Sequence, residues 1–483
     1  MAVNKSMVDF ADISSYWHFR LDFRFLDYTK TKPNFKSSPF RNFVTVIGNG
    51  KDISPDNYAD YNSTDVLYPS VNNFRGGIFR HKDITFINED YGVPKSLEDN
   101  DIIISRSGTV GITYVWNKEE VNKIFGREVV TIPSGYLIVV RVDERKLLPK
   151  FVQYYFNSTL MLRYFNVFGV GKTQKNIAQP EILAIPIPNL AISTQAEILK
   201  KIQPIEIEIT KLKQQIKPQT EVMNMLFVEA LAFDIEQFNQ LKNKKLFSLS
   251  LEDFASETDT RFGCRFHNKA GQFVEDFLKS KTNKRIKDFI SEPIVLGSSV
   301  SPNQYEEEGH YFYVAMSNIK NWQFEEEDCK RVGDDFYKQN IKKTIQVNDI
   351  LMARSGEGTI GKVAIIEDEE AEGVFADFTM RIRLTGINPL FAYYYFRTEI
   401  FQHLVYTHKK GLGNNTNIFP SQVKNFSVPD FSSEQQEEIV SKIKKELNKQ
   451  KDIEVQILEK QAIISKIIED AIKVYETVLS VST

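Results

Sequence analysis

The five residues from Gly169 to Thr173, Gly-Val-Gly-Lys-Thr, are of the types that bind phosphate in nucleotide-hydrolysing proteins. In those proteins the backbone N–H groups of a glycine-rich loop cradle the phosphates, and a further glycine stands five positions before the Gly-Lys pair. That position is Asn166 in this chain, and the corresponding loop Gly411-Leu-Gly-Asn-Asn415 has no lysine. We therefore expect no nucleotide hydrolysis at either loop.

Two other kinds of chemical site also have the wrong spacing. The aromatic residue of Phe168-Gly-Val-Gly171 is one position too close for a methyl-donor loop, and no Pro-Pro dipeptide occurs, so the catalytic loop of amino-methyltransferases is missing. Among six histidines only His403 and His408 have a metal-ligand spacing, and they lack a cysteine or acidic partner at a suitable offset. We expect no catalytic residues and no metal site.

The composition is that of an ordinary globular protein. The 483 residues are enough for about three domains, and a net charge of −3 argues neither for nor against nucleic acid. Two cysteines rule out a disulfide framework and fit a reducing cytoplasm. No apolar leader and no membrane-spanning stretch is evident, so we expect a cytoplasmic protein.

The chain contains a long internal repeat. Asp101-Ile-Ile-Ile-Ser-Arg-Ser-Gly108 returns 248 positions later as Asp349-Ile-Leu-Met-Ala-Arg-Ser-Gly356. Other matched segments return after 240 to 247 positions: Ser54–Tyr58 with Ser301–Tyr305, Phe151–Phe156 with Phe391–Phe396, and Gly169, Gly171 and Ile177 with Gly411, Gly413 and Ile418. Solenoid modules repeat every 20–50 residues. The longer period therefore indicates a duplicated half-molecule with pseudo-twofold symmetry.

Each half is predicted to be a β-rich globule followed by a long helix, which gives an α+β fold. Short runs rich in β-branched and aromatic residues predict the strands: Val66–Tyr68, Ile102–Ser105, Thr113–Trp116, Tyr136–Val142, Tyr311–Ala315, Ile350–Ala353, Lys362–Ile366 and Thr379–Leu384. Helices are expected over Leu148–Tyr164 and Pro389–Val405, and each globule ends at an aliphatic-Pro pair, Ile187-Pro188 or Val428-Pro429.

A heptad pattern follows each globule. Apolar residues alternate at spacings of 3 and 4, as in the seam of a coiled coil, and we expect these residues to pair the two helices: Ile198, Ile202, Ile205, Ile209, Leu212, Ile216, Ile439, Ile443, Ile453, Ile457, Ile464 and Ile467, with Ala471 and Val474 continuing the seam. The shift between the two patterns is a constant 241 positions, so the pair behaves as a ruler of about 40 residues, roughly 60 Å. Pro204 and Pro218 should break or kink the first helix, and Glu446, Gln450 and Lys460 are polar residues on the second seam.

The repeated motifs resemble the DNA-specificity subunit of type I restriction–modification systems. The matching features are the Asp-[ILM]3-Ser/Ala-Arg-Ser-Gly strand, Thr109-Val-Gly111 and Thr359-Ile-Gly361, the Gly-x-Gly loop, the aliphatic-Pro exit, and the helix openings Gln195-Ala-Glu-Ile198 and Gln436-Glu-Glu-Ile439. The resemblance implies two target-recognition domains, at 20–190 and 241–431, after an extension at 1–19. It implies spacer helices at 191–240 and 432–483 that pair antiparallel and set the distance between two half-sites.

The same resemblance implies the partners. They are double-stranded DNA, two DNA adenine methyltransferase subunits docked on the chain, and restriction/translocase subunits joined through the methyltransferases. S-adenosylmethionine, ATP and Mg²⁺ are expected on those partner subunits, and no cofactor on this chain.

The candidate DNA contacts lie on basic faces of the two globules and in the matched loops and turns, since Lys and Arg bind phosphates and Asn and Gln pair with adenine. They are Arg75, Arg80, Lys82, Arg106, Ser107, Thr109, Lys172, Gln174, Lys175, Asn176, Lys284, Arg285, Arg354, Ser355, Thr359, Lys409, Lys410, Asn414, Asn415 and Asn417. Arg106 and Arg354 have an equally good structural interpretation, tying a turn to a neighbouring strand. The alternatives for the whole chain are a duplicated protein-binding scaffold and, more distantly, a nuclease acting alone.

Overall fold

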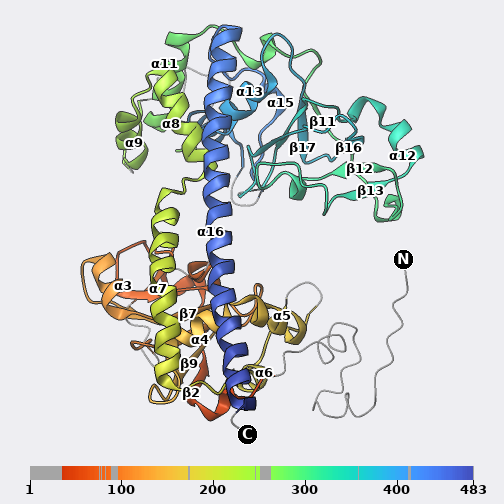
Figure 1. Cartoon of the computed structure of the whole chain (residues 1–483). Coiled ribbons are helices and arrows are strands. Elements are labelled where there is room, and N and C mark those ends of the chain that lie inside the picture. Colours follow the sequence, from red (N-terminus) through yellow and green to blue (C-terminus); the bar gives the residue numbers. More distant parts are fainter. Residues whose placement is uncertain are drawn as a thin grey trace. The chain divides into compact units, whose positions relative to one another are not determined.

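The computed structural model describes residues 35–75, 77, 79–81, 83–88, 96–171, 175–244, 246–250, 263–356, 358–411 and 415–481 (Figure 1). The chain divides into two compact units. Unit 1 comprises Met1–Gln215 and Ile453–Thr483, and unit 2 comprises Ile216–Asp452. Each unit therefore contains one β-rich globule together with helical residues from both halves of the chain.

Unit 1 contains two four-stranded sheets and a short two-stranded one. The first sheet has the order β2-β9-β6-β7, with all pairs antiparallel, and its strands are β2 Val44–Asn49, β9 Leu137–Val142, β6 Ile102–Ser105 and β7 Thr113–Val115. The second has the order β3-β5-β4-β8: Tyr58–Ala59, Thr85–Ile87, Val66–Tyr68 and Val130–Thr131. Strand β1 (Ser37–Pro39) pairs with β10 (Pro186–Pro188), so the first and last strands of this globule lie side by side just before the chain enters its long helix.

Unit 2 repeats the first sheet and three strands of the second. Its first sheet has the order β11-β17-β14-β15: Val295–Leu296, Thr379–Ile382, Ile350–Ala353 and Val363–Ile365. Its second has the order β13-β12-β16: Lys330–Val332, Tyr311–Val314 and Gly373–Phe375. Strand β12 pairs antiparallel on one side and parallel on the other, as β4 does in unit 1. The duplication predicted from the sequence is confirmed in strand order and strand direction.

The predicted aromatic helices are each two helices. In unit 1 they are α4 (Pro149–Phe156) and α5 (Thr159–Phe168), and in unit 2 α13 (Pro389–Phe396) and α14 (Glu399–His408). The expectation of one continuous helix was wrong because a hydroxyl residue interrupts each segment. Ser158 Oγ donates to Tyr155 O at 2.6 Å and Thr398 Oγ1 donates to Tyr395 O at 2.6 Å. This local bond competes with helix continuation.

Smaller helices complete the units. In unit 1 they are α3 Lys118–Phe125 and α6 Gln179–Leu183. In unit 2 they are α8 Gln219–Leu231, α9 Ile235–Asn243, α11 Lys269–Lys281, α12 Asp334–Gln339 and α15 Pro420–Val423. The core of unit 2 joins α8, α9, α11, α13 and α14 to one face of the β14 sheet, around Phe227, Phe238 and Phe401.

The aspartate that opens each repeated motif is a buried structural residue. Asp101 and Asp349 are both 0% exposed. Arg141 holds Asp101 with Nε at 2.6 Å and Nη2 at 3.1 Å, and Arg383 holds Asp349 with Nε at 2.7 Å and Nη2 at 2.8 Å. A bidentate arginine–carboxylate contact of this kind fixes the orientation of both side chains as well as pairing their charges. They fasten the central strand of each sheet to its neighbour.

The glutamine that opens each long helix is also structural. The Oε1 atom of Gln195 accepts a hydrogen bond from Leu148 N at 2.9 Å, and that of Gln436 accepts one from Asn388 N at 2.8 Å. Leu148 and Asn388 are the N-caps of α4 and α13. The repeated glutamine thus fastens each long helix to the globule that precedes it.

The two long helices differ in continuity. Helix α16 is continuous over Ser433–Val481, whereas the first helical segment is divided into α7 (Ile192–Gln215) and α8. The break expected at Pro218 occurs, since Pro218 is the N-cap of α8. The helix does not end at Pro204, which lies inside α7. One missing backbone hydrogen bond is therefore tolerated there.

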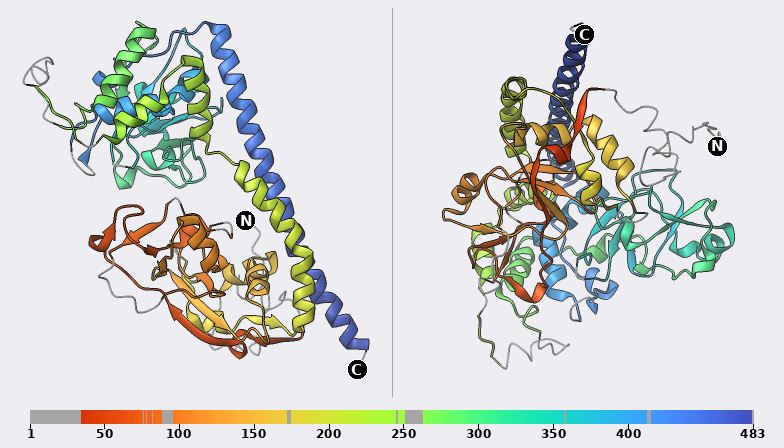
Figure 2. Two further views of the ribbon diagram at one scale, coloured as in Figure 1. Left: turned by 90° about the vertical axis from the view of Figure 1, so that its left-hand side faces the viewer. Right: turned by 90° about the horizontal axis from the view of Figure 1, so that it is seen from below.

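Within unit 1, α7 lies beside the C-terminal half of α16 and runs in the opposite direction (Figures 1 and 2). Lys460 forms an ion pair with Glu208, which explains one of the polar seam positions. Gln450, another of them, accepts a hydrogen bond from Lys217 N at 2.8 Å within unit 2. The knobs-into-holes packing of a coiled coil stays a prediction.

Burial along the helices follows the predicted seam in part, while the pairing of the two helices through it stays a prediction. Seven of its residues are buried, namely Ile198, Ile202, Ile209, Ile439, Ile443, Ile457 and Ile464. The other five residues of the predicted seam are half-buried, namely Ile205, Leu212, Ile216, Ile453 and Ile467. Near the end of α16 the buried residues are Ile468 and Ile472, in place of the predicted Ile467 and Ala471.

Among the described residues no helix combines the length and the apolar character that crossing a bilayer requires.

Candidate nucleic-acid interface

In unit 1 the structure joins three loops side by side through their backbones. Arg106 N donates to Tyr136 O at 2.9 Å, and Ile177 N donates to Arg106 O at 2.9 Å. Gly108 N also donates to Lys175 O at 2.9 Å. We call Tyr136, Arg106–Thr109 and Lys175–Asn176 together loop edge 1. Two loops singled out separately in the sequence thus form one edge.

Unit 2 builds the same edge from the corresponding residues. Arg354 N donates to Phe378 O at 3.0 Å, and Ile418 N donates to Arg354 O at 2.9 Å. Lys410 and Asn417 exchange backbone hydrogen bonds of 2.7 and 2.8 Å, as Val170 and Asn176 do in unit 1. We call residues 354–356, 358–359, 378, 410 and 415–417 together loop edge 2.

Glycines set the turn at the centre of each loop edge. Gly108 and Gly356 have φ of +76° and +85°, a left-handed conformation that glycine adopts at little cost. Gly111 and Gly361 also have positive φ, and a Cβ on Gly111 would lie 2.3 Å from the ring of Phe165. The Arg-Ser-Gly and Thr-x-Gly motifs are therefore backbone requirements of the turn.

The two matched arginines differ in what their side chains contact. The Nε atom of Arg354 donates to Asp377 O at 3.1 Å, and its guanidinium lies 5.6 Å from the Phe378 ring centroid and 6.0 Å from that of Phe419. Arg106 is half-buried, and within the described part of the chain its guanidinium has no ion-pair partner. Arg354 thus has contacts that fit the structural interpretation left open by the sequence, whereas a DNA contact by Arg106 stays a prediction.

Three candidate side chains are turned inward. Ser107, Ser355 and Lys409 are 6%, 9% and 8% exposed. Ser355 Oγ donates to Thr416 O at 3.2 Å, and the Lys409 ammonium lies 5.3 Å from the Tyr406 ring. The structure therefore does not place these three side chains on the outer surface of the loop edges, because they close the loops from inside.

The remaining side chains of the loop edges face outward or lie at the rim. Thr109, Asn176, Lys410 and Asn415 are exposed, while Lys175, Thr359 and Asn417 are half-buried. Lys175 Nζ donates to Asn166 Oδ1 at 3.1 Å, and Thr359 Oγ1 donates to Ser355 O at 2.7 Å. Each edge therefore offers a cation and an amide to solvent.

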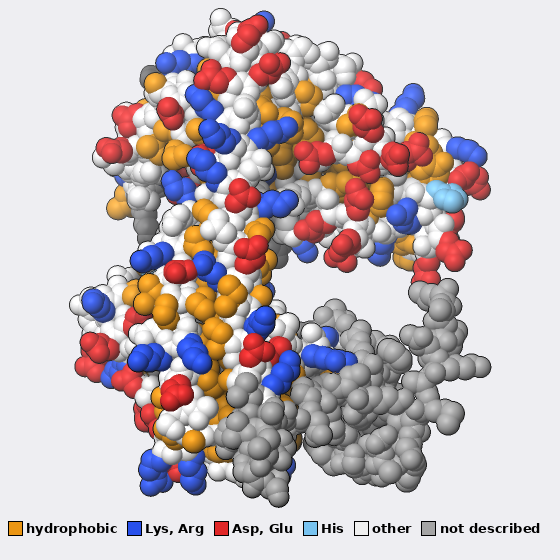
Figure 3. All heavy atoms as spheres, viewed as in Figure 1, with side chains coloured by type: hydrophobic (Ala, Val, Ile, Leu, Met, Phe, Trp, Pro, Cys, Tyr) orange, Lys and Arg blue, Asp and Glu red, His pale blue; other side chains and the backbone are white. Residues whose placement is uncertain are grey.

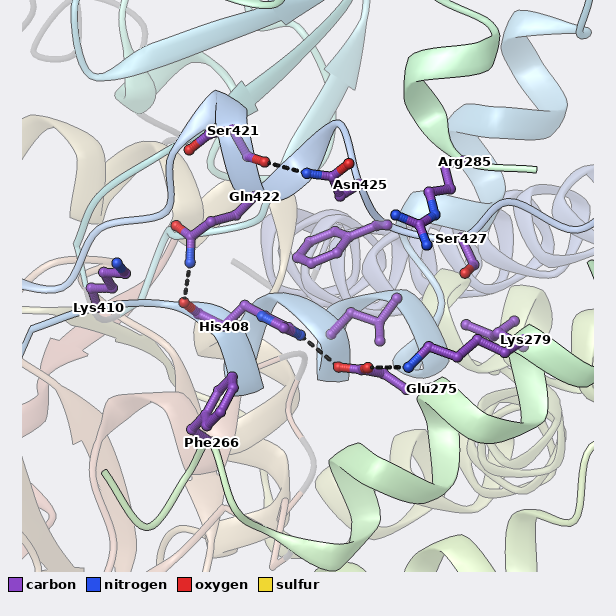
Figure 4. A pocket seen from close by; sticks show the side chains of 13 residues that line it. Phe266, Glu275, Lys279, Arg285, His408, Lys410, Ser421, Gln422, Asn425 and Ser427 are labelled. Carbon is purple, nitrogen blue, oxygen red and sulfur yellow. Dashed lines mark hydrogen bonds and ion pairs between the residues drawn. The ribbon is translucent and has the colours of Figure 1, made fainter. Parts of the chain in front are cut away.

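A polar pocket adjoins loop edge 2 (Figure 4). Arg285, Lys279 and Lys410 line it, together with the ion pair between His408 Nε2 and Glu275 Oε1 at 2.6 Å. Burial raises the pKa of Glu275, but hydrogen bonds and charges from His408 and Lys279 outweigh it and lower the pKa to about 2. The structure thus brings the predicted residues Arg285 and Lys410 to one cationic opening.

Other candidates lie away from the loop edges or outside the described residues. Arg75, Arg80 and Lys284 are exposed. Arg80 is near Lys213 of α7, whose pKa is lowered first by burial and then by the charge of Arg80. Lys82, Lys172, Gln174 and Asn414 lie outside the described residues. No cluster of metal-ligating side chains occurs among the residues that the structure describes.

Sequence reasoning missed the aromatic member of each loop edge. Tyr136 is 55% exposed and Phe378 is 46% exposed. Each immediately precedes a matched strand, β9 or β17. Aligning the two copies at that strand would have paired the two aromatic residues.

Comparison with known proteins identifies the family. The family described as "Type I restriction modification DNA specificity domain" matches twice, over residues 36–221 and 279–473. No curated protein matches.

Solved structures give a likeness of fold at low identity. The S subunit of a type I restriction–modification system from M. genitalium is 11% identical, with 91% of this chain and 96% of that chain covered and a TM-score of 0.38. A structure described as the basis of complex assembly and conformational transition of the type I system is 11% identical, covers 91% and 98%, and has a TM-score of 0.43. The HsdS subunit from Thermoanaerobacter tengcongensis is 10% identical, covers 91% and 97%, and has a TM-score of 0.30. Because the family match spans both repeats and most of the chain, this protein belongs to the type I restriction–modification DNA specificity family.

Proposed function

We propose that this chain is the non-catalytic specificity subunit of a restriction–modification complex and that it reads a split DNA site, one half with each unit. The observation that carries the proposal is the duplication of the loop edge. The same three backbone segments, with a cation and an amide facing outward, are built on the same four-stranded sheet in both units. Two equivalent readers suit a site with two halves.

Each loop edge offers both kinds of contact that DNA recognition needs. Arg106 and Lys175 in unit 1, and Lys410 in unit 2, would bind phosphates, which supply most of the affinity. Asn176 and Asn415 would reach base edges, because an amide pairs with adenine through two hydrogen bonds. The bases chosen would follow from the loop residues of each unit.

The helices would fix the distance between the two half-sites. Helix α16 contributes residues to both units without interruption, and its 49 residues correspond to about 74 Å. A continuous helix resists changes in length and twist better than a loop does. This is what two half-sites at a fixed spacing along DNA would require.

We propose that methyltransferase subunits dock on the paired helices of unit 1. Large apolar side chains are exposed there: Ile207 at 50% on α7, and Val455 at 46%, Leu458 at 63% and Ile463 at 50% on α16. Figure 3 shows apolar side chains gathered along α7 and the adjoining part of α16. Exposed apolar patches mark interaction sites. The methyltransferases would carry S-adenosylmethionine, and the restriction subunits ATP and Mg²⁺.

The test is to express this chain with the adenine methyltransferase subunit of its system and to map methylated adenines across the host genome. We expect one bipartite motif with a constant unread gap. The variant Lys410→Ala should lower the slope of log affinity against log salt by about 0.9, as loss of one phosphate contact does. Lys118→Ala, at an exposed ion pair with Glu128 that belongs to neither loop edge, serves as the control.

Two outcomes would reject the proposal. One is a complex that binds DNA without any sequence preference, which would favour the protein-scaffold reading. The other is cleavage or methylation by the purified chain alone, which would make it an enzyme.

A further inference from the structure

Tyr136 and Phe378 occupy the same place in their units. Each is the third residue of a tight turn closed by a backbone hydrogen bond: Leu137 N donates to Ser134 O at 2.9 Å, and Thr379 N donates to Ala376 O at 2.9 Å. The side chains are 55% and 46% exposed. An aromatic ring therefore projects from a turn at each loop edge.

Turn chemistry does not explain the aromatic residue. Tight turns favour Gly, Pro, Asn, Asp and Ser, each for a backbone reason that Tyr and Phe do not supply. Single exposed apolar residues are common. Here, however, both copies keep an aromatic residue while the two residues before it change from Ser134-Gly135 to Ala376-Asp377. A shared requirement on the exposed ring accounts for this pattern.

Hydrogen bonds fix the backbone that carries each ring. The carbonyl of each aromatic residue accepts the N–H of the matched arginine, Arg106 or Arg354. The residue just before each turn is also hydrogen-bonded: Lys51 N donates to Pro133 O at 2.8 Å, and Ser298 N donates to Phe375 O at 3.0 Å. A ring on a fixed backbone loses little further freedom when it binds, which favours a contact of defined geometry.

The charge around the rings selects the partner. Arg106 and Lys175 belong to the same edge as Tyr136, and Lys410 belongs to the same edge as Phe378, whose ring also lies 5.6 Å from the Arg354 guanidinium. Cations beside an exposed aromatic ring fit a polyanion with flat apolar faces. Duplex DNA has both properties, and proteins bend or open it by inserting apolar side chains between base pairs.

We propose that Tyr136 and Phe378 are matched wedges, each inserting partly between adjacent base pairs of one half-site and unstacking them. This inference rests on the proposed function and adds a contact to it. The amides of the loop edges would read base edges, whereas the rings would select base-pair steps that unstack easily. Pyrimidine–purine steps are the most readily deformed.

The experiment uses the full chain with its methyltransferase subunits and duplexes in which 2-aminopurine replaces adenine at each step of a mapped half-site. Unstacking raises 2-aminopurine fluorescence. Because methyltransferases flip their target base out of the stack, 2-aminopurine is not placed at the methylated adenine, and we expect an increase at one other step in each half-site. Tyr136→Ala should abolish it in one half and weaken binding about tenfold, as loss of one stacking contact does. Phe378→Ala should do the same in the other half.

The controls distinguish an effect of the aromatic ring from an effect of its hydroxyl group and from unfolding of the variant. Tyr136→Phe keeps the ring and should keep the signal. Tyr61→Ala removes another ring of unit 1 that is 56% exposed but lies outside loop edge 1, and it should change nothing. Circular dichroism confirms that each variant is folded.

The failure of this inference differs from failure of the proposed function. Selective binding with unchanged fluorescence at every step, or binding that Tyr136→Ala and Phe378→Ala leave intact, would overturn the wedges alone. A signal lost in both halves from one substitution would overturn their assignment to separate half-sites. A wild-type complex without any sequence preference would instead remove the proposed function.

Discussion

At the scale of single residues, the repeated motif contains side chains with opposite roles. Asp101 and Asp349 are fully buried and hold an arginine, whereas Thr109, which directly follows the motif in the first copy, is exposed. The sequence showed that these residues were matched but not which way they face. Burial depends on partners distant in the chain, since Arg141 lies 40 positions after Asp101. The same limit hid Tyr136, whose exposure follows from the turn that holds it.

We predict that Asp349→Asn destabilises the protein by about 3 kcal/mol, because it leaves Arg383 with an imperfect partner at a buried position. Asp334→Asn is the matched control, since its ion pair with Lys338 has side chains 55% and 70% exposed and should contribute less than about 1 kcal/mol. Urea unfolding measures both. Equal losses in the free energy of unfolding for the two variants would show that the buried ion pair contributes no more than an exposed one.

A second residue-scale prediction compares two glycines of one turn. Gly108→Ala meets no atom within 4 Å and should cost only the left-handed backbone penalty, about 1 kcal/mol. Gly111→Ala adds a Cβ 2.3 Å from the Phe165 ring and should cost about 1–3 kcal/mol more. Thermal unfolding of the two variants gives the comparison. If Gly111→Ala lost less stability than Gly108→Ala, helix α5, which carries Phe165, would have to move away at little cost.

At the scale of elements, seven of the eight strands predicted from local patterns match the observed bounds to within one residue at each end, whereas nine other strands of the described residues were not predicted. Strands β4, β6 and β14 have the predicted bounds, because short β-branched and aromatic runs between turn residues carry that information locally. The pairing of β2 with β9, where Val44 lies opposite Val142, could not be predicted, since such register is set by packing between segments far apart in sequence. Helices α4 and α5 were merged because their apolar residues continue across the interruption at Ser158.

The divided α7–α8 segment and the continuous α16 sharpen the prediction about spacing. Inserting four residues after Gln215 and four after Asp452 should lengthen both helical segments by about 6 Å, close to two base-pair steps. The half-site sequences should stay the same while the unread gap grows by about two base pairs in methylation maps. Insertion after Gln215 alone is the control, because α16 would keep its original length. An unchanged gap in the double insertion would mean that the helices do not set the spacing.

At the scale of the whole molecule, the sequence predicted two equivalent globules, and the structure and the family match confirm them. The structure adds the composition of the units, each with one globule and residues from both long helical regions. That arrangement was not predictable from repeat boundaries, because α16 is one element in the sequence yet belongs to both units. The structure also indicates where a globule begins and ends, and so where one could be replaced by that of a relative. In unit 1 β1 pairs with β10, and in unit 2 Arg285 forms a β-bridge with Ser427.

The central claim is that each unit reads one half of a split site. The most direct test replaces residues 36–189 with the matching segment of a family member of known but different specificity and maps adenine methylation in a host that supplies the methyltransferase. The reciprocal exchange of residues 285–429 is the control. The account predicts that the first exchange changes one half of the methylated motif and the second changes the other half, while the unread gap stays constant. A change in both halves from either exchange, or in neither from both, would contradict it.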